Sequence, residues 1–192
     1  MTTTVPGREP LRIHPHKFIM WVAIGGIVMM FAGLTSAYIV KKNQSSWLQF
    51  DLPIELFYST AVIVLSSITM FLSVRAIRAG KMNQYKTMIT VTAVLGFAFL
   101  LLQYLGFKDL QAKNIAMVGA RSNSAASFLF VITFLHMIHV LGGVTALIVF
   151  WVKAKSKKIT ENSVVSVEIL GTYWHFVDLL WIYLFLFYNW IG

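Results

Sequence analysis

Charged residues divide this sequence into five long apolar runs. The runs cover about residues 18–40, 56–74, 87–107, 125–151 and 164–191, and charge enters only the last of them, as Glu168 and Asp178. A helix needs roughly 20 apolar residues to cross a bilayer core of about 30 Å, whereas membrane-spanning strands show an apolar–polar alternation that these runs lack. The sequence therefore predicts an all-α, polytopic membrane helix bundle with five transmembrane helices.

The composition supports a membrane protein and limits its chemistry. Charged residues make up 12% of the chain and hydrophobic residues 58%, whereas a soluble domain carries about 25% charged residues. The chain contains no cysteine. That absence excludes disulfides, thiolate metal sites, iron–sulfur clusters and a cysteine nucleophile.

The basic residues predict the orientation of the chain. Sixteen Lys and Arg stand against seven Asp and Glu, and most of the net charge of +9 flanks the runs on one membrane side. That side holds Arg8, Arg12, Lys17, Arg75, Arg78, Lys81, Lys86, Lys153, Lys155, Lys157 and Lys158, and the other holds Lys41, Lys42, Lys108, Lys113 and Arg121. The positive-inside rule then places the N-terminus in the cytoplasm and the C-terminus outside.

Two further expectations follow from this orientation. Residues 1–16 should form a short, flexible cytoplasmic tail, and residues 17–192 the membrane domain. The positive charge is explained by topology and by attraction to lipid headgroups, so we expect no nucleic-acid partner.

Ionisable residues inside the runs are confined to the last two. The fourth run carries His136 and His139, and the fifth carries Glu168, His175 and Asp178. Spacings of three and seven place each set on one stripe of its helix. Trp174 and Trp181 form a second stripe on the fifth helix.

Four interpretations of these residues stay open on chemical grounds. Neutral His, Glu and Asp can hydrogen-bond between helices, which we favour together with a contact surface for another membrane subunit. A proton path and a bis-histidine haem, with one His from each helix, are the alternatives. A di-metal carboxylate centre fits least, because it requires two Glu-x-x-His repeats and several more carboxylates.

The first run carries small residues near one face. Gly26, Gly33 and Ala37 recur at spacings that bring them to one side of a helix. Small residues at such spacings allow two membrane helices to approach closely. We therefore expect this face to pack against a helix.

The fifth run contains the most specific element of the chain. Residues 173–181 read Tyr-Trp-His-Phe-Val-Asp-Leu-Leu-Trp, which resembles the Trp-His-Phe-Val-Asp-x-x-Trp element near the C-terminus of subunit III of haem–copper oxidases. Glu168 matches the Glu that precedes that element in the family. Thr133–Gly143, Leu102–Gln103 and Phe31–Gly33 resemble further family stretches in the same order. The resemblance covers residues 17–192 and is to the short bacterial form with five helices.

The chain departs from the longer family members in two respects. It lacks the first two of their seven helices, and Gly26 stands where they commonly carry a membrane-buried Glu. The role of that acid is therefore not carried over to this chain. Leu135 and Met137 also replace a Phe and a Gly beside the two histidines of the fourth run.

The resemblance implies a non-catalytic core subunit of a proton-translocating terminal oxidase of aerobic respiration. Such a subunit would lie in the bacterial inner membrane as a multi-pass protein, stabilise subunit I and support its proton uptake while oxygen is reduced to water. Subunit I would be its main contact, beside subunit II, other respiratory-complex subunits and membrane lipids. Haems and copper would belong to partner subunits, and this chain would hold no cofactor apart from bound phospholipid.

We expect no catalytic, cofactor-binding or metal-binding residue in this chain. The family-motif residues should instead form a buried polar network between the fourth and fifth helices, made up of His136, His139, Glu168, Trp174, His175, Asp178 and Trp181. A small bis-histidine membrane cytochrome is the alternative from another class. A proton-coupled carrier ranks last, because it predicts an internal repeat with broken helices that the halves of this chain do not show.

The electron donor is not encoded in these residues. Cytochrome c oxidases and quinol oxidases both contain this kind of subunit, and donor sites belong to other chains. We favour cytochrome c over quinol as the donor.

Overall fold

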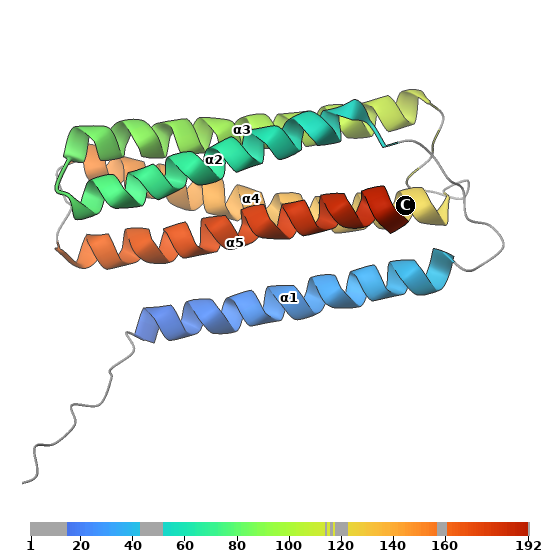
Figure 1. Cartoon of the computed structure of the whole chain (residues 1–192), viewed down its shortest axis with the longest axis horizontal. Coiled ribbons are helices and arrows are strands. Elements are labelled where there is room, and N and C mark those ends of the chain that lie inside the picture. The colour runs from blue at the N-terminus through green and yellow to red at the C-terminus, as the bar shows by residue number, and fades with distance from the viewer. Residues whose placement is uncertain are drawn as a thin grey trace, which may run out of the picture.

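A computed structural model describes residues 15–42, 52–113, 115, 117, 123–156 and 161–191. Within these ranges the regular secondary structure is all helical (Figure 1). The helices are α1 (Pro15–Lys42), α2 (Ile54–Arg78), α3 (Met82–Ala112), α4 (Ser124–Lys155) and α5 (Glu161–Ile191). All five are long and apolar enough to cross a membrane, which confirms the predicted fold class.

Each helix extends beyond the apolar run from which it was predicted. The last turn of α1 contains Lys41 and Lys42, and that of α2 contains Arg75 and Arg78. Lys and Arg are good helix formers, so a charge ends an apolar run without ending the helix. The flanking turns can therefore carry their charges into the headgroup region.

Some of the residues that predict the orientation lie outside the described residues. Residues 1–14 of the predicted tail lie outside them, as do Arg8, Arg12, Arg121, Lys157 and Lys158. The cytoplasmic N-terminus therefore stays a prediction.

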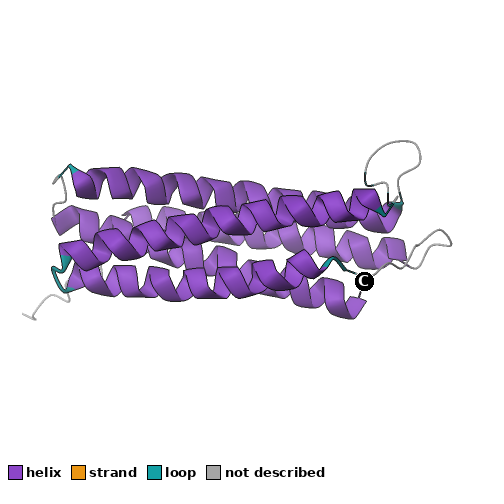
Figure 2. Cartoon of the chain, turned by 90° about the horizontal axis from the view of Figure 1, so that it is seen from above, coloured by secondary structure: helices purple, strands orange, loops and turns teal. Residues whose placement is uncertain are grey.

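Helices α2 to α5 form a four-helix unit. Each packs against two others, in the pairs α2–α3, α3–α4, α4–α5 and α5–α2. Seven of the eight buried residues of α2 alternate at spacings of three and four: Leu56, Ser59, Ile63, Ser66, Met70, Ser73 and Ile77. A buried repeat of 3.5 residues makes a coiled-coil-like seam with interlocking side chains. Figure 2 shows the helices running along one common axis.

The turn after α2 sets up its antiparallel partner. Gly80 adopts a left-handed φ of 69°. Its amide donates to the carbonyl of Ile77, and the amide of Lys81 donates to that of Ala76. This Schellman arrangement ends α2 and lets α3 begin at Met82, so the two helices pack as a hairpin.

Helix α1 packs outside this unit, along α4 and α5 (Figure 1). Its buried residues are Ile24, Phe31, Thr35 and Tyr38. They recur at spacings of seven, four and three and so form one narrow stripe. The remaining faces of α1 are exposed in the isolated chain.

The predicted packing face of α1 is not used within this chain. Gly26, Gly33 and Ala37 are exposed, and a Cβ built on either glycine meets nothing within 4 Å. The stripe through Phe31 packs instead, because aromatic rings of α4 and α5 fill the space opposite it. Close packing of this face against another helix stays a prediction for these three residues.

Candidate functional site

Trp174 lies at the centre of the four-helix unit. Its indole is 1% exposed, and its Nε1–H donates to the Ser66 hydroxyl of α2 at 3.1 Å. The ring fits a slot left by Gly96 of α3 and Gly143 of α4, where an added Cβ would approach ring carbons to 2.8 Å. One α5 side chain therefore contacts all three other helices of the unit.

Trp181 repeats this arrangement two turns along α5. Its Nε1–H donates to the Thr60 hydroxyl of α2 at 3.0 Å. Its ring packs edge-on against Phe99 of α3, with centroids 5.1 Å apart. A buried indole N–H needs an acceptor, and α2 supplies one for each tryptophan.

The α2 hydroxyls do not belong to the predicted site, which comprises residues of the fourth and fifth runs only. Ser59, Ser66 and Ser73 recur every seven residues and are all fully buried. Gln103, from the family-like Leu-Gln pair, donates to the Ser59 hydroxyl at 2.8 Å. Serines at a spacing of seven were the available signal for a polar seam on α2.

His136 is buried among aromatic rings. Its centroid lies 5.2 Å from that of Trp181, 5.7 Å from Phe99 and 6.4 Å from Phe31 of α1. Neither ring nitrogen has a hydrogen-bond partner among the described residues. His136 therefore marks the point where α1, α3, α4 and α5 meet, through ring packing.

His139 bonds within its own helix. Its Nδ1 lies 2.7 Å from the carbonyl oxygen of Leu135 and donates to it. The backbone carbonyl of His139 accepts from the Tyr173 hydroxyl of α5 at 3.0 Å. The polar link between α4 and α5 at this level thus comes from a tyrosine that was not singled out in advance.

His175 and Asp178 face α2. The Nδ1 atom of His175 lies 2.7 Å from the Ser67 hydroxyl. Asp178 is 3% exposed, and neither carboxyl oxygen has a hydrogen-bond partner among the described residues. Ser67 also lies next to this carboxyl group, although not in hydrogen-bond geometry with it.

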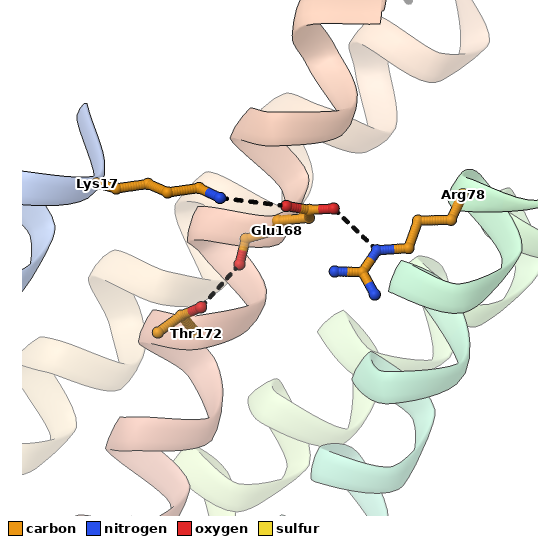
Figure 3. A network of polar contacts seen from close by, with 4 residues as sticks. All are labelled: Lys17, Arg78, Glu168 and Thr172. Atoms are coloured by element: carbon orange, nitrogen blue, oxygen red, sulfur yellow. Dashed lines mark hydrogen bonds and ion pairs between the residues drawn. The ribbon is translucent and has the colours of Figure 1, made fainter. Parts of the chain in front are cut away.

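Glu168 joins three helices at one end of the molecule (Figure 3). Its Oε1 accepts from Arg78 Nε of α2 at 2.8 Å, and its Oε2 lies 3.6 Å from Lys17 Nζ of α1. The Thr172 hydroxyl donates to the backbone carbonyl of Glu168 at 3.0 Å. These residues and His175 line a cavity of about 390 Å³ between α1, α2 and α5.

The arrangement differs from the expected network between the fourth and fifth helices. Among the described residues, the hydrogen bonds of Trp174, His175 and Trp181 run to α2, whereas His139 bonds within α4. Glu168 pairs with cations of α1 and α2. The structure therefore gathers the motif residues around α2 more than between α4 and α5.

The positions of the histidines and acids also bear on whether they could bind a metal ion or a haem. Within the part of the chain that the structure describes, no three His, Asp or Glu side chains converge to hold a metal ion. The His175 ring points to Ser67, whereas three aromatic rings surround His136. The two histidines thus line different parts of the bundle, which disfavours a shared haem between them.

Comparison with known proteins gives a consistent result. The model of the family described as "Cytochrome c oxidase subunit III" matches residues 47–192. "Probable cytochrome c oxidase subunit 3" of Nocardia farcinica is 30% identical, over 96% of this chain and 97% of that protein. A protein of the same name from Mycobacterium tuberculosis is 28% identical, over 91% and 90%. "Cytochrome bo(3) ubiquinol oxidase subunit 3" of Buchnera aphidicola is 26% identical, over 88% and 83%.

Proposed function

Since this chain belongs to the cytochrome c oxidase subunit III family, we propose that it is the non-catalytic subunit III that stabilises subunit I of a haem–copper terminal oxidase. It is a multi-pass membrane protein with five helices able to span the bilayer. In this role it binds subunit I as its main contact and supports proton uptake during the reduction of oxygen to water.

The stabilising role is supported by one observation: the tryptophans of the family motif pack inside this chain. Trp174 and Trp181 pack inside the four-helix unit and donate hydrogen bonds to Ser66 and Thr60. Side chains fixed in this way hold four helices in one rigid body. A rigid body suits a subunit that supports a neighbouring catalytic chain.

The end of the molecule that carries Glu168 supports the role in proton uptake. Glu168, Arg78 and Lys17 are partly exposed there. Partly exposed charged groups at a membrane surface stay in contact with water and shape the local electric field. A hydrated group of this kind next to subunit I suits a place where protons enter from water.

Subunit I would hold the haems and the copper, with subunit II and other respiratory-complex subunits nearby. The exposed faces of α1 and α2 are apolar, including Trp21, Met29, Leu65 and Phe71. Such faces suit contact with lipid or with another membrane chain. The bacterial relatives support a location in a bacterial inner membrane.

Cytochrome c is the electron donor that we propose. The more similar relatives bear the name of cytochrome c oxidase subunits. A quinol oxidase is the second candidate, because the Buchnera relative is named a ubiquinol oxidase subunit.

Purification of a tagged chain from its own membranes tests this function. We expect a haem- and copper-containing subunit I to co-purify, and the complex to consume oxygen with reduced cytochrome c. Deletion of the chain should shorten the active lifetime of the oxidase and leave its haem and copper content unchanged. A Soret band in the isolated chain would instead establish a small membrane cytochrome, and oxidation of quinol alone would establish the second candidate.

A further inference from the structure

A row of polar groups on α5 leads from the end of the molecule into the bundle. Glu168, Thr172, His175 and Asp178 recur at spacings of four, three and three, which keeps them on one side of the helix. Figure 3 shows the outer part of the row, with Glu168 and Thr172 beside Lys17 and Arg78. The inner part ends at Asp178, which is 3% exposed.

The outer part of this row has room for water. The cavity of about 390 Å³ is bordered by Lys17, Arg78, Glu168, Thr172 and His175. A water molecule occupies about 30 Å³ in the liquid and requires two to four polar partners. The cavity thus offers both the space and the polar partners for a short water chain from Glu168 to His175.

The inner part of the row continues through α2. The His175 Nδ1 atom and the Ser67 hydroxyl are 2.7 Å apart, and Ser67 lies next to the Asp178 carboxyl group. A hydroxyl group both accepts and donates a proton. A small rotation of the Ser67 side chain would bring its oxygen from the imidazole to the carboxylate.

Asp178 lacks the hydrogen bonds and the ion pair that usually stabilise a buried carboxylate. Its two oxygens have no hydrogen-bond partner among the described residues. Lys17 and Arg78, the cations on the neighbouring helices at this end, both pair with Glu168. The histidines of α4 do not serve Asp178 either, since His136 is enclosed by rings and His139 bonds to Leu135. An ionised carboxylate without a partner is costly inside a membrane, so this position requires access to a proton.

We propose that Asp178 is a proton-exchange site, connected to water at the Glu168 end of the molecule through the cavity, His175 and Ser67. In the uptake step, a hydronium ion in the cavity gives a proton to Nε2 of His175. Nδ1–H of the same ring passes its proton to the Ser67 oxygen, and the Ser67 hydroxyl proton moves to the Asp178 carboxylate. Three O–H or N–H bonds form and three break, and the ring ends neutral as its other tautomer. Release follows the reverse path.

This site goes beyond the proposed function, because proton exchange at Asp178 does not depend on turnover of the oxidase. Infrared spectroscopy of the purified, resting complex that contains the chain tests it without turnover. A protonated carboxyl band should be present in the wild type and absent in Asp178→Asn. On transfer to D₂O, Ser67→Ala and His175→Phe should slow the isotope shift of this band by at least about tenfold.

Ser73→Ala is the matched control. Ser73 is a fully buried serine of the same helix with no hydrogen-bond partner among the described residues, and it does not border the cavity. Its removal should leave the exchange rate of the Asp178 band unchanged. Equal exchange rates in the wild type, Ser67→Ala and His175→Phe would overturn the route, and equal slowing in Ser73→Ala would show a packing effect and also overturn it.

A second measurement covers the case in which Asp178→Asn does not assemble. An apolar carbodiimide reacts with protonated carboxyl groups in the membrane, and mass spectrometry of the wild-type chain locates the adduct. Modification of Asp178 supports the site. An unmodified Asp178 after prolonged treatment would overturn it, whatever the complex does in turnover.

Discussion

Helix α1 and the four-helix unit of α2 to α5 are held in place in different ways. The unit is closed by interlocking seams and by two tryptophans that hydrogen-bond across it. Helix α1 contacts α4 and α5 along one stripe. The family match begins at residue 47, after α1 and before α2. The unit is therefore the closed core of the molecule, and α1 packs against its outside.

Polar contacts along its length secure α1 to α5. Lys17 pairs with Glu168 at one end, and the Lys42 ammonium group donates to the backbone carbonyl of Ile191 at the other. Between them, the Thr35 and Tyr183 hydroxyl groups are 3.2 Å apart. Such contacts fix the position of a helix along its neighbour with little burial. Substitutions in α1 should consequently cost less stability than equivalent ones in the unit.

Trp174→Ala should have the largest effect. Truncation of a buried tryptophan costs about 3–5 kcal/mol of unfolding free energy, and here it also leaves the Ser66 hydroxyl without its donor. Trp21→Ala is the control on α1, where the indole is 63% exposed, and should change stability by less than about 0.5 kcal/mol. Circular dichroism during detergent unfolding measures both, and similar losses would erase the distinction between the regions.

Gly143→Ala should come next. The added Cβ would lie 2.8 Å from a ring carbon of Trp174, and overpacking of this kind costs about 1–3 kcal/mol. Its neighbour Gly142 has nothing within 4 Å, so Gly142→Ala should stabilise the helix by about 0.5–1 kcal/mol. The same unfolding measurement compares the two variants. A change of unfolding free energy of the same sign in both would contradict the close contact between Gly143 and the Trp174 ring.

Ser66→Ala should have an effect of similar size. It removes the acceptor of the Trp174 indole at 3.1 Å, and an unsatisfied buried donor costs about 1–3 kcal/mol. Ser73→Ala removes an equally buried hydroxyl that has no partner among the described residues and should be neutral or stabilising. The indole N–H vibration in Raman spectra reports the lost bond directly. An unchanged frequency in Ser66→Ala would contradict it.

Glu168→Gln should have the smallest effect on stability, below about 1 kcal/mol, because exposed ion pairs contribute little. It should nevertheless loosen the N-terminal end of α1, which Lys17 ties to α5. Because the chain has no cysteine, spin labels at Phe18→Cys and Ile68→Cys can report the distance between α1 and α2. We expect a broader distance distribution by pulsed EPR.

Asp109→Asn is the control for this measurement. It breaks an ion pair with Lys113 at the C-terminal end of α3 and should leave the distribution narrow. Equal distributions in wild type and Glu168→Gln would show that the stripe of apolar residues alone positions α1.

The five helices were predictable because charge interrupts apolar runs in membrane proteins. Their ends were not, since Lys41 and Arg75 continue the helices that they were taken to end. The buried tryptophans followed from the motif, but their acceptors did not. A serine or threonine in a membrane helix can bond its own backbone, as Ser59 does to Leu56 and Thr35 does to Phe31. Sequence alone therefore does not distinguish a hydroxyl that crosses to another helix.

The small residues of α1 and Glu168 of α5 show two further limits of prediction from sequence. A spacing such as Gly26 to Gly33 indicates that a close approach is possible, without saying which helix makes it. Glu168 was assigned to a buried network because it matches the Glu that precedes the family motif. Its partner Arg78 lies 90 positions away, and only the packing of α2 against α5 brings them together.

The hydroxyl acceptors of α2 have a consequence for biogenesis. Helices α2 and α3 leave the ribosome early and can pair as a hairpin as soon as both are inserted, because their contacts are local. The tryptophans that close the bundle lie on α5, which is synthesised after the other four helices. Until α5 enters the membrane, Ser66 and Thr60 have no indole donor, and the slot of Gly96 and Gly143 is unfilled. Completion of the bundle thus waits for the synthesis of α5, and a chain truncated before Trp174 would be left as an open bundle for quality-control proteases.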